Sequence, residues 1–176
     1  MTTAQIAKQQ NATADIVRRS FEKIVVTTGV GRASSQSGFE EKVLPQIVRD
    51  LGFIAGQKAQ VRRAKKSIAG FKSRAGQIVG LRTTLRGRAM IDFFERLSTI
   101  VLPRVRDFTG IDPHAVDEGG VLNIGLKEHL VFPEINPEES THVFSLAIGI
   151  VPKKKDRAVA LDLYRALNIP FRKNAK

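Results

Sequence analysis

The feature that most constrains this chain is a stretch of forty-one residues, 51–91, with ten basic side chains and no acidic one. An ordinary solvent-exposed surface mixes both signs of charge, and an unrelieved positive surface repels itself unless a polyanion neutralises it. Hydroxyls beside the charges can bond phosphate oxygens. We therefore interpret this stretch as a nucleic-acid-binding surface rather than an ordinary basic face. Its basic residues are Lys58, Arg62, Arg63, Lys65, Lys66, Lys72, Arg74, Arg82, Arg86 and Arg88, and the neighbouring hydroxyls belong to Ser67, Ser73, Thr83 and Thr84.

The whole composition agrees with a compact protein that binds a polyanion. The chain of 176 residues has a net charge of +12, a pI of about 10.5 and 42% hydrophobic residues, enough for one domain with a real core. Cysteine is absent, which excludes disulfides and thiolate metal sites and is compatible with the cytoplasm. No apolar run approaches the ~20 residues of a membrane span. Tryptophan is absent and tyrosine occurs once, so we expect recognition of RNA shape and backbone rather than base stacking.

The hydrophobic periodicity predicts an α+β fold, an antiparallel sheet with helices packed on it and a long basic hairpin loop. Residues 1–19 are expected to be an N-terminal lead, partly disordered or a short helix, and 20–176 a single RNA-binding domain. A capping box at Ser37–Glu40 is expected to start the first amphipathic helix, and Pro103 to stop the second. The expected strands are 23–28, 57–63, 78–85, 121–126 and 142–151; the expected helices are 39–51, 90–101 and 155–168; the expected loops are 68–80 and 107–120.

Catalytic constellations are scarce. The chain has no dinucleotide or phosphate-loop fingerprint, and its three histidines, interpreted as surface or strand-end residues, lack metal-ligand spacing. The acidic group Asp107, Asp112, Asp117 and Glu118 could hold magnesium for phosphoryl chemistry, although a solvated loop explains it as well. A nucleic-acid-processing enzyme that uses this loop is therefore the alternative to a structural RNA-binding protein, and a free-standing regulator of RNA is a third possibility. No cofactor is expected.

Several segments, in order and spacing, resemble a known family over residues 20 to 173. The family is ribosomal protein five of the large subunit, the bacterial-type 5S-rRNA-binding protein. The segments are Lys23-Ile24 to Gly29-Val30-Gly31, Gly56-Gln57-Lys58, 63–72, Thr84-Leu85-Arg86-Gly87, 93–97, 103–108, Phe132-Pro133-Glu134-Ile135 and Pro170-Phe171-Arg172-Lys173.

The resemblance implies a non-enzymatic protein of the cytoplasmic large ribosomal subunit that attaches 5S rRNA in the central protuberance. Its implied partners are 5S rRNA, 23S-type rRNA, peptidyl-site tRNA and, through an intersubunit bridge, ribosomal protein thirteen of the small subunit. Neither a membrane nor a homo-oligomer is expected.

Carried over by position, the resemblance implies three groups of contact residues. Two departures from the family pattern stand on the RNA side: Thr27 replaces a common asparagine and Ser20 a common arginine. The expected 5S rRNA contacts are Gln57, Lys58, Arg62, Arg63, Lys65, Thr84, Arg86 and Thr27. The expected tRNA-contacting loop, 70–80, contributes Phe71, Lys72, Ser73, Arg74 and Gln77. The expected bridge residues are Asp107, Asp112, Asp117 and Glu118.

Overall fold

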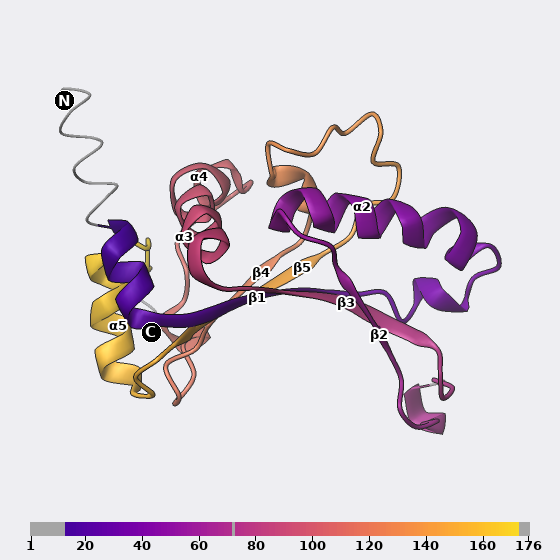
Figure 1. The fold of residues 1–176 in the computed structure, drawn as a ribbon, viewed down its shortest axis with the longest axis horizontal. Coiled ribbons are helices and arrows are strands. Elements are labelled where there is room, and N and C mark those ends of the chain that lie inside the picture. The colour runs from indigo at the N-terminus through magenta and orange to yellow at the C-terminus, as the bar shows by residue number, and fades with distance from the viewer. Residues whose placement is uncertain (1–12, 72, 173–176) are drawn as a thin grey trace. The chain divides into compact units, whose positions relative to one another are not determined.

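The computed structural model describes residues 13–71 and 73–172, and its fold is the predicted α+β class (Figure 1). Five strands form one antiparallel sheet in the order β2-β3-β1-β5-β4. The strands are β1 (Phe21–Gly29), β2 (Gln60–Arg63), β3 (Ile78–Leu85), β4 (Leu122–Leu126) and β5 (Leu146–Pro152). The α-helices are 13–20, α2 (Leu44–Ala55), α3 (Gly87–Arg96), α4 (Leu102–Arg104) and α5 (Arg157–Ala166).

The chain divides into two compact units, each built from separate stretches of sequence. The first unit comprises residues up to Ile24, Leu85–Ile124 and Ile148 onward; the second comprises Val25–Thr84 and Gly125–Ala147. Strands β1, β3, β4 and β5 each contribute residues to both units. Each unit is described by itself below.

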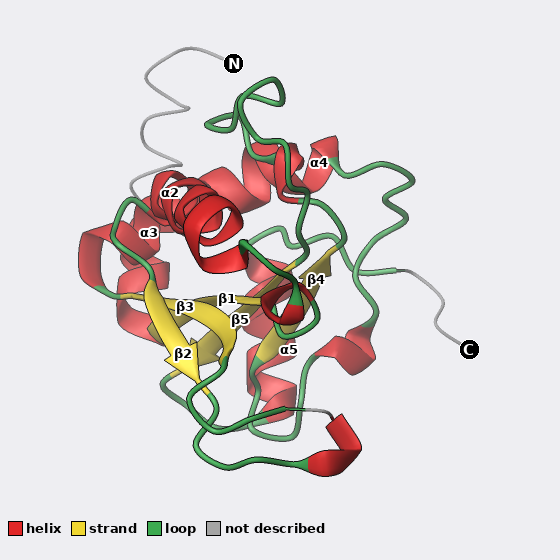
Figure 2. Ribbon diagram, turned by 90° about the vertical axis from the view of Figure 1, so that its right-hand side faces the viewer, coloured by secondary structure: helices red, strands yellow, loops and turns green. Residues whose placement is uncertain are grey.

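In the second unit, α2 lies along one face of the strands, as Figures 1 and 2 both show. The residues that it buries recur every three or four positions, with Ile47, Leu51 and Ile54 at most 3% exposed. Pro45 stands in the first turn of α2, where its missing N–H costs no helical hydrogen bond. The helix ends at Gly56, which adopts the left-handed conformation (φ 68°) that glycine reaches without strain.

The start of this helical segment differs from the predicted capping box. A π-helical turn, Phe39–Val43, precedes α2, and its N-cap is Gly38 rather than Ser37. Gly38 has φ 76°, and no side chain caps the turn. The capping-box prediction is therefore wrong, because the left-handed residue that begins the helix favours a glycine over a capping serine.

The strands of the second unit bury one face and leave the other open. In β3, Ile78 and Leu81 are 1% exposed and Thr83 is 2% exposed, while the intervening side chains remain partly accessible. At the unit's β4 and β5 ends, Gly125 and Ala147 are exposed. Alternation along a strand thus separates a helix-covered face from an open face, and the open face carries small and polar residues.

The first unit is organised around aromatic packing. The ring of Phe21 lies 5.4 Å from that of Phe94 and 5.7 Å from that of Tyr164, measured between centroids. The Tyr164 hydroxyl is 2.9 Å from the carbonyl oxygen of Gly120 and 3.0 Å from that of Ile150. Burial raises the pKa of Tyr164 well above its usual value, so the hydroxyl keeps its proton and donates to these carbonyls.

Helical structure continues past Pro103, contrary to the prediction that this proline ends it. A π-helical turn, Leu97–Val101, joins α3 to α4, and Pro103 occupies the first turn of α4. Its ring is tolerated there because a first-turn residue needs no N–H donor. The backbone becomes extended only at Val105 (ψ 125°), so the helical segment ends there and not at the proline.

Candidate nucleic-acid interface

The open face of strands β2 and β3, in the second unit, carries cationic and polar side chains. Gln60 pairs with Arg82, Val61 with Leu81 and Arg62 with Gly80. Because Leu81 is buried on the helix-covered face, the alternating residues Gln60, Arg62, Arg82 and Thr84 belong to the open face. Neither β2 nor β3 contains an acidic residue, so the charge of this face is unrelieved positive.

Hydrogen bonds hold the side chains of two expected 5S rRNA contacts, Gln57 and Thr27, against the strands of this unit. The Gln57 side-chain amide donates to the Thr84 carbonyl oxygen over 2.8 Å. The Thr27 hydroxyl donates to the Ala147 carbonyl oxygen over 3.2 Å. The Gln57 side chain is thereby fixed beside Thr84, and its amide oxygen and the Thr84 hydroxyl remain as groups that RNA could bond.

The expected cations do not all lie together. The register of β2 shifts between Arg62 and Arg63, so Arg62 faces Gly80 whereas Arg63 faces Ile78. Arg63 instead donates to the Gly76 carbonyl oxygen over 3.0 Å. Lys58 and Lys65 are exposed in the connections that flank β2. The basic residues that are consecutive or close in the sequence therefore lie on more than one surface of the unit.

Arg86 belongs to the first unit. Its guanidinium donates to the Glu22 carbonyl oxygen over 3.2 Å and forms an ion pair with the Glu22 carboxylate at 3.4 Å. The pKa of Glu22 lies below its usual value, chiefly because Lys23 bonds the carboxylate and less because Arg86 does. Arg86 is therefore already paired with an acid within its own unit.

The expected tRNA-contacting loop is more ordered than the predicted long loop. Ile68 and Ser73 exchange backbone hydrogen bonds around a 3-10 turn, Ala69–Phe71, and Ala64 pairs with Gln77 and Gly76. The chain therefore forms an extension of the β2–β3 hairpin, and β3 begins at Ile78, as predicted. Lys72 and the side chain of Phe71 lie outside the part of the chain that the structure describes.

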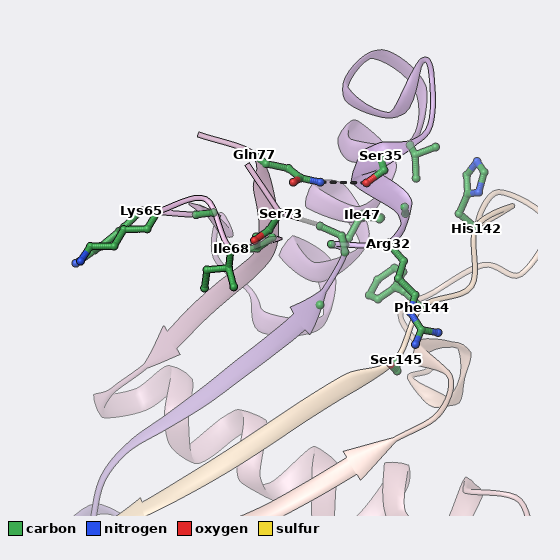
Figure 3. Close-up of a pocket in the computed structure, with 18 of the residues that line it drawn as sticks. Arg32, Ser35, Ile47, Lys65, Ile68, Ser73, Gln77, His142, Phe144 and Ser145 are labelled. Atoms are coloured by element: carbon green, nitrogen blue, oxygen red, sulfur yellow. Dashed lines mark hydrogen bonds between the residues drawn. The ribbon is translucent and has the colours of Figure 1, made fainter. Parts of the chain in front are cut away.

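Gln77 anchors the base of this hairpin. Its side-chain amide donates to the Ser35 hydroxyl over 3.1 Å (Figure 3) and to the Ser34 hydroxyl over 2.9 Å. Its amide oxygen accepts from the Arg74 backbone N–H. The Arg74 side chain is exposed. Arg74 thus presents its charge to solvent, whereas Gln77 is engaged in holding the hairpin.

A cleft of about 1360 Å³ lies between this hairpin and the segment 142–145, all within the second unit (Figure 3). Ile68 and Val143, both about half exposed, line it together with Arg32, Lys65 and Lys66. No acidic residue is among those that line the cleft. Its walls therefore add to the positive charge of this unit.

Two of the four acidic residues of 107–120, Asp112 and Asp117, cap turns. Asp112 accepts from the His114 backbone N–H over 2.8 Å, and Asp117 accepts from that of Val121 over 2.8 Å. Asp107 lies near Arg106 at 3.9 Å, and Glu118 is exposed. Within residues 13–71 and 73–172, no group of three or more potential ligands could hold a metal ion. These carboxylates do not form the magnesium site that the enzyme alternative requires.

Sequence reasoning missed a buried polar network in the second unit. His129 is fully buried, so its interpretation as a surface or strand-end residue is wrong. Its Nε2 lies 2.7 Å from the Ser140 Oγ, which in turn donates to the Asp50 carboxylate over 2.8 Å. Gln46 donates to both Asp50 and Ser140. Asp50 and Ser140 are 90 positions apart, and no local motif joins them.

Comparison with known proteins decides the family. A model of the C-terminal part of the ribosomal L5 family matches residues 78–171, and the model of ribosomal protein L5 matches residues 20–74. The chain belongs to the ribosomal protein L5 family. The large ribosomal subunit protein uL5 of Rubrobacter xylanophilus is 47% identical over 155 residues, which cover 88% of this chain and 84% of that protein. The uL5 protein of Brachyspira hyodysenteriae is 42% identical over 167 residues, or 95% and 87% of the two chains.

Membership of the ribosomal protein L5 family confirms the resemblance and the prediction of a structural, non-enzymatic protein. The matches to the two L5 family models are separated only by residues 75–77, in the basic hairpin, whereas the two compact units interleave along the chain. The boundary between the two family models thus falls between β2 and β3, two strands that pair with each other. No helix among the described residues is long and apolar enough to cross a membrane.

Proposed function

We propose that this protein is a constituent of the large ribosomal subunit in the cytoplasm and that it attaches 5S rRNA there through the open face of its second unit. Its membership of the ribosomal protein L5 family supports the place in the ribosome. The observation that carries the 5S assignment is the acid-free open face, where Gln57 and Thr84 are fixed beside Arg62 and Arg82. We also expect 23S-type rRNA to be a neighbour of the protein in the subunit.

The chemistry of this face suits an RNA backbone. Guanidinium groups pair with phosphates, while a hydroxyl and an amide can bond ribose or phosphate oxygens. The small residues Gly125 and Ala147 leave room for a backbone to approach the strands. Recognition is therefore expected to depend on RNA shape and phosphate position, as the scarcity of tyrosine and tryptophan suggests.

The hairpin and the acidic loop supply two further proposed contacts. The hairpin tip at 70–76 reaches the peptidyl-site tRNA, with Arg74 as the described cation that is exposed there. The loop with Asp107 and Glu118 meets the basic ribosomal protein thirteen of the small subunit in an intersubunit bridge, because opposite charges steer two surfaces together. Asp112 and Asp117 hold the loop in shape through their caps.

The two neighbouring threonines of β3 test the open face. Thr84→Val is expected to weaken 5S rRNA binding by about 1–2 kcal/mol, because the valine cannot bond a phosphate or ribose oxygen. Thr83→Val is expected to leave binding unchanged and to raise the free energy of unfolding by about 1 kcal/mol, since its buried hydroxyl has no hydrogen-bond partner. Filter binding and urea denaturation measure the two effects. Equal losses of binding in both variants would refute the assignment of the open face.

The hairpin tip is tested by the double substitution Lys72→Ala and Arg74→Ala. The melting temperature and 5S rRNA affinity are expected to stay unchanged, because the Arg74 contact within the hairpin uses its backbone N–H and not its side chain. Retention of peptidyl-site tRNA on reconstituted ribosomes is expected to fall, by roughly tenfold if two phosphate contacts are lost. The control replaces Lys42 and Arg165, two exposed cations elsewhere. Loss of 5S binding with intact tRNA retention would assign the tip to the 5S surface instead.

A further inference from the structure

A second group of cations gathers in the first unit, where the end of β5 meets the end of helix 13–20. The Lys153 backbone N–H donates to the Ser20 carbonyl oxygen over 2.8 Å, and the Lys153 ammonium donates to the Arg18 carbonyl oxygen over 3.0 Å. These two bonds bring the pair Arg18 and Arg19 next to the run Lys153–Lys155, although 135 positions separate Arg18 from Lys153. We call these five residues the helix-end cluster.

Lys153 has a structural role within the helix-end cluster. The last carbonyl groups of a helix have no partner inside the helix, and the helix dipole makes that end partly negative. The Lys153 ammonium satisfies one of these carbonyls, which fixes the turn after β5 against the helix. The other four side chains of the cluster, from Arg18, Arg19, Lys154 and Lys155, belong to exposed residues.

The acids nearest in sequence form no ion pair with these four cations among the described residues. Asp156 caps α5, and its carboxylate accepts from the N–H groups of Ala158 and Val159 over 2.8 and 3.1 Å. Glu22 is paired with Lys23 and Arg86. Asp15, one helical turn before Arg18, forms no ion pair with the cluster among the described residues. The four exposed cations thus form no ion pair among the described residues, and the helix-end cluster carries a net positive charge.

We propose that the helix-end cluster binds an RNA phosphate backbone, at a site separate from the open face of the second unit. Hydrogen bonds hold two basic segments together, so their mutual repulsion is maintained in the folded state and a polyanion would relieve it. In a protein of the ribosome, the polyanion with that charge density is RNA. The inference rests on the chain's place in the ribosome and not on the assignment of the 5S contacts.

The test replaces Lys154 and Lys155 with alanine and leaves the structural Lys153 in place. The control replaces Arg104 and Arg106, two exposed cations of the same unit, and so makes the same change in net charge. Affinities for isolated 5S rRNA and for protein-free large-subunit rRNA are measured separately over a range of potassium chloride concentrations. A melting curve for each variant verifies that the fold is intact.

We expect the plot of log K against log salt to become less steep by about two for one of the RNAs, with the control unchanged. The RNA that shows the loss is the one that the helix-end cluster contacts. Unchanged slopes for both RNAs would overturn the proposal. If binding to whole subunits nevertheless weakened, the helix-end cluster would contact a protein partner and not RNA. The Thr84→Val variant changes only the open face, so failure of one assignment leaves the other measurable.

Discussion

Asp50→Ala is expected to lower the free energy of unfolding by about 3 kcal/mol, the largest effect on stability predicted for this protein. Asp50 is 2% exposed, and its carboxylate accepts hydrogen bonds from Ser140 and Gln46 at 2.8 and 3.2 Å. Alanine would leave the Ser140 hydroxyl without its acceptor, would remove one of the acceptors of Gln46, and would remove the acid that faces His129 at 3.7 Å. Urea denaturation of the purified protein measures the loss.

The direction of the hydrogen bonds explains why the loss should be large. Burial lowers the pKa of His129, so its ring is neutral near pH 7. Its Nδ1 accepts from the Phe144 backbone N–H over 3.4 Å, which leaves the proton on Nε2 to be donated to Ser140. Ser140 can then donate to Asp50 only while the carboxylate is present. Removing Asp50 therefore disturbs a chain of donors that ends at this one acceptor.

A matched control comes from the turn before the same helix. Glu41→Ala also removes one carboxylate, but Glu41 is exposed, and surface substitutions of this kind change stability by about 0.5 kcal/mol or less. An Asp50→Ala variant no less stable than the Glu41→Ala variant would show that the network contributes nothing to stability.

The affinity for isolated 5S rRNA is expected to fall roughly 250-fold when salt is raised from about 50 to about 200 mM. This change corresponds to neutralisation of about five phosphates, or a slope on the order of −4 in log K against log salt. The acid-free stretch 51–91 supplies the charges, and Arg62 and Arg82 lie on the open face itself. Titration at several salt concentrations measures the slope.

Single substitutions show which charges contribute to that slope. Arg62→Ala is expected to make it less steep by about one, whereas Lys42→Ala, in the turn that precedes α2, should leave it unchanged. A slope near zero for the unmodified protein would contradict electrostatic binding. Equal changes in the two variants would instead indicate a dependence on net charge without a defined site.

Local pattern was enough for much of the fold. The strand expected at 78–85 has the same bounds as β3, and arginine and glycine follow it in the sequence. The two π-helical turns were not predictable, since they depend on how each helix continues past a proline. His129 was misinterpreted for a related reason: its partners Asp50 and Ser140 are remote in sequence, and only tertiary structure unites them.

The sequence indicated the residue types of the candidate site, but not which side chains lie on the same face of the sheet. Sequence identified Gln57, Thr84 and the basic run as one surface. The register shift in β2 separates Arg62 from Arg63, and Glu22 occupies Arg86 in the other unit. Strand register and ion pairs decide which of several neighbouring charges faces a partner. Neither can be predicted from local composition.

The interleaved units have a consequence for synthesis of the protein. The second unit cannot be completed until residue 147 has been translated, and the first needs both the earliest and the latest described segments. Such long-range closure delays folding until most of the chain exists. Through that interval the basic stretch 51–91 has been synthesised, whereas residues 125–147, which complete its unit, have not. An incompletely folded basic chain can bind nearby polyanions non-specifically. Prompt binding to its proper partner after synthesis would prevent this.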